Sequence, residues 1–406
     1  MPYYRTALRM LGASQNPKLS EGDKALQKLG FKIGRNEYFA PTNVAVYFNG
    51  KGNSQPDPYF NGEGPERVDC NFCGACMTGC RYNSKNTLDK NYLYLAEKNG
   101  VKIFSESEVY DVRPLDGNNG EEGYKVFWRS STKFFKAKGY YTAKGIIFAG
   151  GVLGTVKLLL KLKKTSLPNL SDVVGKFIRT NSESLIGITT FDKDKSFSDG
   201  VAIGSILKTD ENTSLEPVHY GSNSGFWRIL MSPMVEGKNV FIRVMKIARD
   251  LLIHPIKNFK VFTVWNWSKR TQILLFMQTI NSKLKFKLGL FGLSSSMQEG
   301  NAPTAFIPKA KFLAEKYAEI VNGKPMVLLT ETLAGIPTTA HILGGAVMGE
   351  NSGSGVIDKN NKVFGYKNMY VCDGSMISSN PGVNPSLSIT AITEFAMSKI
   401  PVKPEG

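Results

Sequence analysis

Residues 369–391 read M-Y-V-C-D-G-S-M-I-S-S-N-P-G-V-N-P-S-L-S-I-T-A and join a short apolar run to a loop and then to a helix. The first four residues predict a strand, which stops at Asp373, where the composition changes to that of a loop. We expect Asn384 to be the helix N-cap and Pro385 the first helical residue, because the N–H that proline lacks would be unpaired there. The segment therefore directs a helix N-terminus toward whatever lies beyond the strand, which suits an anion or a ring that gains negative charge during a reaction.

A histidine lies in the segment before it, residues 338–349, which reads T-T-A-H-I-L-G-G-A-V-M-G. The two glycines that follow His341 allow another group to approach closely. A lone histidine among small and apolar residues is often an ordinary core residue. Here the second polar cluster, at Asp373 and Asn384, also combines a strand end with a helix start. This favours a catalytic role for His341, whose titration range lies near neutrality.

Length and composition limit the class of protein. A chain of 406 residues suggests two intimately joined domains rather than a string of modules. The 51 basic and 34 acidic residues give a net charge of +17, which would suit nucleic acid or an anionic membrane surface. The basic residues are dispersed and no recognition motif accompanies them, so we do not expect a nucleic-acid partner. The first ten residues lack the apolar core of a signal peptide, and we expect a cytoplasmic location.

Four of the five cysteines lie in the window C-N-F-C-G-A-C-M-T-G-C. Their C-x2-C-x2-C-x3-C spacing is that of a bacterial ferredoxin segment, and the clustering is unlike a secreted disulfide framework. Arg81 stands where such a run usually has proline, and no second run supplies a further ligand. Two interpretations follow, a tight turn of buried reduced thiols or an iron–sulfur cluster. The candidate ligands of the cluster are Cys70, Cys73, Cys76 and Cys80.

Residues 145–155, G-I-I-F-A-G-G-V-L-G-T, predict a strand, a glycine turn at Gly150 and Gly151, and a helix over 155–161. As a phosphate-binding fingerprint the turn is imperfect, because Ala149 replaces the first glycine of G-x-G-x-x-G and no acidic residue ends a second strand about twenty positions later. A complete nicotinamide site is therefore not expected. The glycines either contact a cofactor or allow close strand–helix packing in a parallel sheet.

The middle of the chain, residues 171–335, has a different character. Alternating apolar residues predict antiparallel strands, and we expect a sheet domain inserted into the cofactor-binding fold. Residues 239–255, N-V-F-I-R-V-M-K-I-A-R-D-L-L-I-H-P, predict a basic amphipathic helix. Such a helix is typical of peripheral membrane contact or of a lid over an apolar pocket, but it is also compatible with an ordinary surface helix.

These motifs resemble those of the glucose-methanol-choline oxidoreductases, most closely their cholesterol oxidase-like branch. The similar stretches are H-I-L-G-G-x-x-M-G, G-V-I-D, K-V-F-G-Y-K-N-M-Y-V-C-D-G-S, N-P-G-V-N-P-S-L-S-I-T-A, the cysteine window, A-G-G-V-L-G-T and R-T-N-S-E-S-L. Together they cover most of the chain. The resemblance implies an α/β plus α+β fold, in which an incomplete FAD-binding Rossmann-like domain (residues 1–170 and 336–406) carries an inserted antiparallel-sheet substrate-binding domain (residues 171–335).

The resemblance also implies FAD as cofactor and a large apolar alcohol, such as a sterol, as substrate. Alcohol oxidation needs a base for the hydroxyl proton and an acceptor for hydride. His341 would be the base or would position the hydroxyl, and Asn384 would bind the same oxygen or the flavin edge. The remaining expected flavin contacts are Val109 at the adenine, Asp373 and Gly374 at the ribityl-pyrophosphate portion, and Pro385 and Ser386 at the reduced flavin pyrimidine.

Members of this family open with a strand, a G-x-G-x-x-G turn and an acidic strand end that bind the ADP moiety, and the sequence contains no such opening. We therefore expect this polypeptide alone to bind FAD weakly, with an upstream or separately encoded N-terminal segment completing the enzyme. Two alternatives stay open. One is an electron-transfer subunit with an iron–sulfur cluster, and the other is an inactive fragment or binding protein without flavin.

Overall fold

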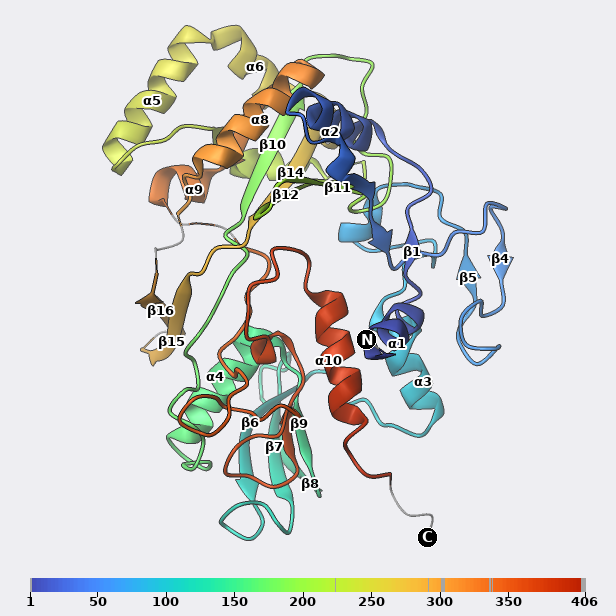
Figure 1. Ribbon diagram of the computed structural model, residues 1–406, viewed down its shortest axis with the longest axis vertical. Helices are drawn as coiled ribbons and strands as arrows, with labels where there is room; N and C mark the ends of the chain where they lie inside the picture. Colours follow the sequence, from blue (N-terminus) through green and yellow to red (C-terminus); the bar gives the residue numbers. More distant parts are fainter. Residues whose placement is uncertain are drawn as a thin grey trace.

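The computed structural model describes residues 2–222, 224–290, 292–300, 304–335, 337 and 339–402. Ile336, at a predicted domain boundary, and Thr338 lie outside these residues. Figure 1 shows two bodies. One is built on a large twisted sheet, and the other on helix α4 (Gly151–Lys163), several small sheets and helix α10 (Ser386–Met397). None of the described helices combines the length and the apolar character needed to cross a membrane.

The large sheet has seven strands, and every pair of neighbours is antiparallel. In spatial order they are β13 (Met231–Pro233), β17 (Gly323–Leu328), β10 (Ser184–Thr190), β14 (Thr271–Gln278), β12 (Thr213–Val218), β11 (Ser205–Asp210) and β2 (Phe39–Pro41). Strand β14 is buried on both faces, as expected of a central strand with continuous apolar sequence. The edge strand β2 comes from outside the range 171–335.

Alternate residues of β14 supply two different cores, because successive side chains point to opposite faces. Leu274 and Phe276 pack in one cluster with helices α2 (Glu21–Lys32) and α8 (Pro308–Val321). Leu275 and Met277 pack in the other with Trp267. The sequence predicts Ser20 as the N-cap of a helix that starts at Glu21. Helix α2 does begin there, with a capping box between Ser20 and Asp23. The sheet is thus covered by helices on one face and by irregular segments and short helices on the other.

Four helices cover or flank the second face and the nearby sheet edge. They are α5 (Val240–Ile253), α6 (Pro255–Thr263), α7 (Trp267–Arg270) and α9 (Leu329–Ala334). The predicted basic amphipathic helix of residues 239–255 is α5, and Asn239 caps it by accepting from the N–H of Ile242 at 2.9 Å. Helices α5 and α6 stand at the outer side of the upper body (Figure 1).

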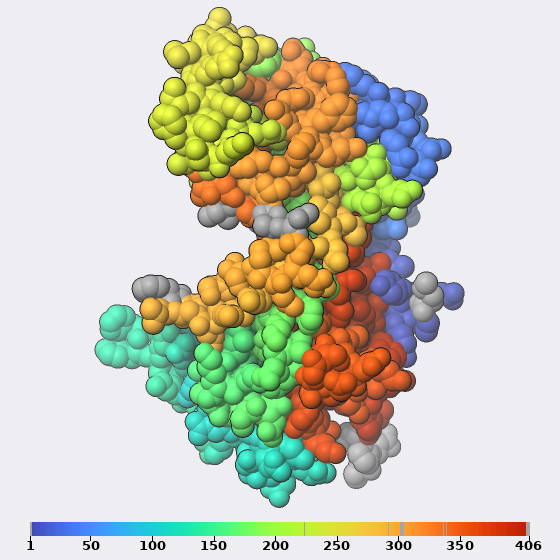
Figure 2. Space-filling view, turned by 60° about the vertical axis from the view of Figure 1, so that its left-hand side comes forward, coloured from blue at the N-terminus to red at the C-terminus, as the bar shows by residue number. Residues whose placement is uncertain are grey.

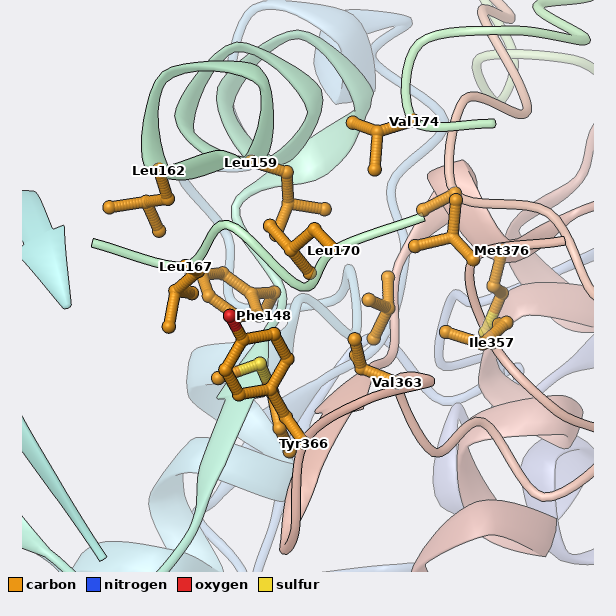
Figure 3. Packing of buried hydrophobic residues seen from close by; sticks show 14 of the residues in the cluster. Phe148, Leu159, Leu162, Leu167, Leu170, Val174, Ile357, Val363, Tyr366 and Met376 are labelled. Carbon is orange, nitrogen blue, oxygen red and sulfur yellow. The ribbon is translucent and has the colours of Figure 1, made fainter. Parts of the chain in front are cut away.

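The second body holds a parallel strand pair at its centre. Strand β9 (Ile146–Phe148) pairs with β18 (Met369–Val371), although more than two hundred residues separate them in sequence. Around this pair lie α4 and an antiparallel meander of β6 (Ser107–Pro114), β7 (Tyr124–Ser130) and β8 (Lys138–Ala143). Figure 3 shows the core of this body, where Leu159 and Leu162 of α4 face Phe148 and residues of the C-terminal segment such as Ile357.

The remaining elements are short. They are α1 (Pro2–Met10), β1 (Ser14–Gln15), β3 (Asn43–Val44), β4 (Ser54–Gln55), β5 (Arg67–Val68), α3 (Tyr92–Lys98), β15 (Lys283–Gly289) and β16 (Gly292–Glu299). The β15–β16 hairpin packs on α4 through Phe286, which joins Val152 and Val156 in one cluster. In Figure 2 this hairpin projects below a hollow at the waist of the molecule.

Three predicted elements differ from the structure. The apolar residues of V-K-I-F predict a strand over 101–104, but it does not form, and these side chains are half-exposed, with no strand beside them in the described part of the chain. The sequence also predicts one helix over 87–98, which is divided into a 3-10 turn (Leu88–Lys90) and α3. Helix α4 begins at Gly151 rather than at 155, so the glycine turn forms its first turn.

Candidate active site

His341 lies against a buried carboxylate. Its Nδ1 contacts Oε1 of Glu183, and the other oxygen of Glu183 accepts the backbone N–H of Ala340. The Glu183 side chain is 1 % exposed, and that of His341 is 16 % exposed. Because an ionised carboxylate can only accept, it favours the tautomer with the proton on Nδ1 and leaves Nε2 as an acceptor. This is the form that a general base requires.

Backbone and amide contacts hold the segments that carry this pair. Arg179 and Leu343 exchange two backbone hydrogen bonds, of 2.8 and 2.9 Å, so the chain before β10 runs beside the segment of His341. The side chain of Asn181, which is fully buried, donates to the carbonyl of Val383 at 3.1 Å. Segments that are distant in the sequence thereby converge where the two bodies meet.

Asn384 faces a second buried carboxylate. Its Nδ2 lies 3.2 and 3.0 Å from the two carboxylate oxygens of Glu216 on β12. The prediction that Asn384 caps the following helix is wrong. Helix α10 begins at Ser386 with Pro385 at the N-cap position and no side-chain cap, because the Asn384 amide is turned toward the sheet instead.

Burial has the largest effect on the pKa of Glu216. The side chain is 1 % exposed, and desolvation raises its pKa to about 7, although the hydrogen bond from Asn384 and the nearby His341 act in the opposite direction. Glu183 is also close enough to raise this pKa through like-charge repulsion. Glu183, Glu216, His341 and Asn384 therefore form one electrostatically connected group, in which Glu216 exchanges a proton near neutral pH.

The strand register places Glu216 beside an apolar surface. Glu216 lies opposite Leu275 of β14, and Leu275 lies opposite Leu185 of β10, so all three share one face of the sheet. Leu275 and Met277 on this face belong to the core cluster that also contains Val261 of α6. The carboxyl group thus lies at the border of a wall made of aliphatic and aromatic side chains.

The ends of the parallel strands are joined by a polar contact. The Thr155 hydroxyl on α4 donates to Oδ2 of Asp373, and the N–H of Gly150 donates to the same hydroxyl oxygen at 3.1 Å. The other Asp373 oxygen accepts the N–H of Ser375 at 2.8 Å. Asp373 is buried, and its neighbour Gly374 accepts a hydrogen bond from Gly344. The structure therefore gives Asp373 a role in linking β18 to α4.

Two of the predicted cofactor residues line one cavity of about 670 Å³. Val109 of β6 and Gly150 at the end of β9 are both in its wall, together with Thr155 and Lys157 of α4. Gly151 adopts a φ of 72° at the start of α4, with no atom within 4 Å of where a Cβ would lie. The structure therefore brings Val109 and Gly150 together, but His341 and Asn384 are not part of this cavity wall.

The four clustered cysteines are reduced and border a small void. Burial raises the pKa of the Cys70 thiol to about 11, whereas hydrogen bonds from the segment 82–85 outweigh burial at Cys80 and lower the pKa of that thiol. Across the residues that the structure describes, no three or more His, Cys, Asp or Glu side chains are arranged to hold a metal ion.

Comparisons with known proteins place this geometry in a family. The sequence profile described as GMC oxidoreductase matches residues 310–393. A cholesterol oxidase of Acinetobacter baumannii is 43% identical over 413 residues, which cover 99% of this chain and 74% of the relative. A cholesterol oxidase of Mycobacterium tuberculosis is 37% identical over 428 residues, covering 100% of this chain and 72% of the relative. The chain belongs to the GMC oxidoreductase family.

A solved structure agrees with this GMC assignment at the level of the fold. Pyridoxine 4-oxidase from Mesorbium loti has a TM-score of 0.54 at 13% sequence identity, and the match covers 95% of this chain and 71% of that one. The resemblance predicted from the motifs is therefore confirmed, and so is a mixed fold of helices and antiparallel sheets.

Sequence reasoning missed two residues of this GMC oxidoreductase site, Glu183 and Glu216. Glu183 lies in R-T-N-S-E-S-L, which we used as a family motif without giving the glutamate a role. Glu216 could have been noticed in the sequence, because it is the one charged residue of T-S-L-E-P-V. In the structure this segment is a strand in which all six residues are buried. A buried charge of this kind requires a partner.

Proposed function

We propose that this GMC oxidoreductase oxidises the CH–OH group of a large apolar alcohol, with sterols as the leading candidates and FAD as the hydride acceptor. The single observation that carries the proposal is the contact of His341 with Glu183 beside the pair formed by Glu216 and Asn384. This arrangement combines a base that is oriented for its task with a second proton-exchanging group.

In the proposed reaction, Nε2 of His341 accepts the proton of the substrate hydroxyl. The Glu183 carboxylate stabilises the imidazolium that forms, in the way that a carboxylate orients and stabilises the histidine of a catalytic triad. Asn384, held by Glu216, fixes the position of the oxygen atom. Bound FAD would supply the acceptor for the hydride that leaves the carbinol carbon.

An apolar substrate is supported by the surroundings of Glu216 and by the relatives. The sheet face that it shares with Leu185 and Leu275 is apolar and offers few partners to a polar ligand. Two relatives that match almost the whole chain are cholesterol oxidases. We therefore infer that residues 171–335 bind the substrate, and that residues 1–170 and 336–406 bind the flavin.

The residues of the flavin-binding part fit FAD in two respects. The cavity beside Val109 and Gly150 borders the N-terminus of α4, a site suited to a phosphate, and the uncapped N-terminus of α10 at Pro385 and Ser386 is suited to a ring that gains negative charge. Asp373 and Gly374 would stabilise the cavity wall, because the Asp373 carboxylate binds the hydroxyl of Thr155, which lines the cavity.

We further propose that this Rossmann-like domain is incomplete and that a separate strand-turn-helix segment completes it. Strand β9 pairs with β18 along one edge, and no described strand pairs with its other edge. Ile147 and Leu153, beside this edge, are half-exposed. Without the added segment we expect weak FAD binding, and a stoichiometric flavin spectrum of the purified protein alone would contradict this. A cytoplasmic location stays a prediction.

The test of the catalytic proposal is a His341→Gln variant in protein saturated with added FAD. We expect alcohol-dependent bleaching of the flavin absorbance to slow by a factor on the order of 10²–10⁴. His254→Gln is the matched control, because His254 is exposed at the end of α5, away from the four-residue group. An unchanged rate in His341→Gln would remove this residue from the mechanism.

A further inference from the structure

Helices α5 and α6 expose an unusual amount of apolar surface. Figure 1 shows them at the outer side of the upper body, and Figure 2 shows them in yellow on its surface. Leu252 is 81 % exposed, and Trp265, just after α6, is 86 % exposed. We call the exposed apolar side chains of the helical hairpin α5–α6 the hairpin face. It consists of Phe241, Met245, Leu252, Ile256, Phe259 and Trp265.

Three of the exposed apolar residues of α5 share one side of the helix. Phe241, Met245 and Leu252 follow one another at i, i+4 and i+11, and so they lie on one stripe of the helix. The opposite side is fixed by Arg243, which is buried and donates to the carbonyls of Gly237 and Leu333, both at 2.9 Å. Helix α5 is therefore anchored through Arg243, while the stripe of Phe241, Met245 and Leu252 faces outward.

The charges beside the hairpin face are positive. Three exposed basic residues lie near it on the two helices, and they are Arg249, Lys257 and Lys260. Asp250 is the one acidic residue between 239 and 265, and it is already paired with Lys324 and with the amide of Asn258. The outward surface thus combines large apolar side chains, a tryptophan and cations. This combination is typical of elements that lie in the interface of an anionic bilayer.

We propose that α5 and α6 form a membrane-docking hairpin, whose partner is the surface of a bilayer that contains anionic lipids. The hairpin face enters the boundary between head groups and acyl chains, and Arg249, Lys257 and Lys260 bind the lipid phosphates. A second copy of this chain fits less well, because two such surfaces would bring like charges together. An ordinary solvated surface helix, the simplest sequence interpretation of residues 239–255, would expose its polar side instead.

The inner side of helix α6 contacts the sheet face that carries Glu216, which relates the proposed docking to the candidate active site. Val261 of α6 packs in the same cluster as Leu275 and Met277, on the sheet face that carries Glu216. A bilayer bound to the outer side would therefore hold an apolar alcohol on the same side of the sheet as Glu216. This consequence rests on the proposed function, whereas the docking itself does not.

The test is co-sedimentation of the whole protein with vesicles, measured without substrate. Mixed phosphatidylcholine and phosphatidylglycerol vesicles are compared with vesicles of phosphatidylcholine alone. We expect binding to the mixed vesicles that weakens with salt, and a loss on the order of tenfold or more in the double variant Leu252→Glu, Phe259→Glu. Replacing Lys257 and Lys260 by Gln should weaken binding to mixed vesicles roughly fivefold per cation.

The matched control is Phe134→Glu, Phe135→Glu, because these residues are 93 % and 87 % exposed in the loop between β7 and β8. The control should bind vesicles like the parent. Equal losses in both double variants, binding of the hairpin variant at the parent level, or no binding of the parent would overturn the proposal. So would a dimer that depends on Leu252 in the absence of vesicle binding. Because turnover is not measured, failure of the proposed function would leave this result unchanged.

Discussion

The amide of Asn384 lies within hydrogen-bonding distance of both carboxylate oxygens of Glu216, although 168 residues separate the two in sequence. This contact connects the central sheet of one body to the start of α10 in the other. Since burial raises the pKa of Glu216 to about 7, the contact also couples the protonation of the sheet residue to the position of Asn384.

The first prediction concerns the pH dependence of stability. The folded state keeps the Glu216 proton up to about pH 7, whereas an unfolded glutamate loses its proton near the ordinary pKa of 4.5. Between these values the folded state binds more protons, so the contribution of Glu216 to stability is lost as pH rises. The free energy of unfolding of the parent should therefore fall between pH 5 and pH 8 by up to about 3 kcal/mol more than that of Glu216→Gln.

Urea unfolding at the two pH values measures this difference. Glu211→Gln is the control, because Glu211 is an exposed residue two positions before β12. It should leave the pH dependence unchanged. An identical pH dependence in the parent and in Glu216→Gln would show that Glu216 titrates like an exposed glutamate.

The second prediction separates orientation from packing at Glu183. Glu183→Gln removes the charge that favours the proton on Nδ1 of His341, while it keeps the size of the side chain. We expect kcat to fall on the order of 10²–10⁴-fold with a smaller change in KM, because the imidazole is no longer held in the tautomer whose Nε2 accepts a proton. The comparison of kcat with KM is the decisive measurement, since a disturbed binding site would change KM as well.

Local features of the fold were predictable from the sequence, because their causes lie within a few residues. The Ser20 capping box, strand β9 with its glycine turn, and strand β18 follow from caps, apolar runs and breakers. The strand expected over 101–104 failed for the opposite reason. Its apolar alternation is real, but a strand also needs a neighbour, and local sequence does not specify one.

The candidate site depended on contacts that spacing does not encode. His341 was found from its local setting beside two glycines, but its partner Glu183 is 158 residues away. Asn384 was expected to cap α10, and the buried Glu216 takes its amide instead. Local capping preference therefore yielded to the larger cost of leaving a buried carboxyl group without a partner.

The third prediction tests the link between the parallel strands. Thr155→Val removes the hydroxyl that joins Gly150 to Asp373 and leaves a buried carboxylate oxygen without this donor. We expect a loss of about 1–3 kcal/mol in the free energy of unfolding. Thr155→Ser keeps the hydroxyl and should retain most of the stability. Equal losses in both variants would mean that the methyl group, rather than the hydrogen bond, stabilises this junction.

The last prediction compares two glycines with similar backbone angles. Gly344, three residues after His341, has a φ of 82°, and a Cβ there would lie 2.1 Å from the carbonyl oxygen of Phe177. Gly151 has a φ of 72°, with open space around the same position. Alanine at 151 should therefore cost only the left-handed strain, about 1–2 kcal/mol, whereas alanine at 344 should cost more, because the backbone must also move. That movement would shift His341 away from Glu183, so Gly344→Ala should also lose activity under conditions where both variants remain folded. Equal unfolding free energies and equal activities in the two variants would contradict this account of the segment that carries His341.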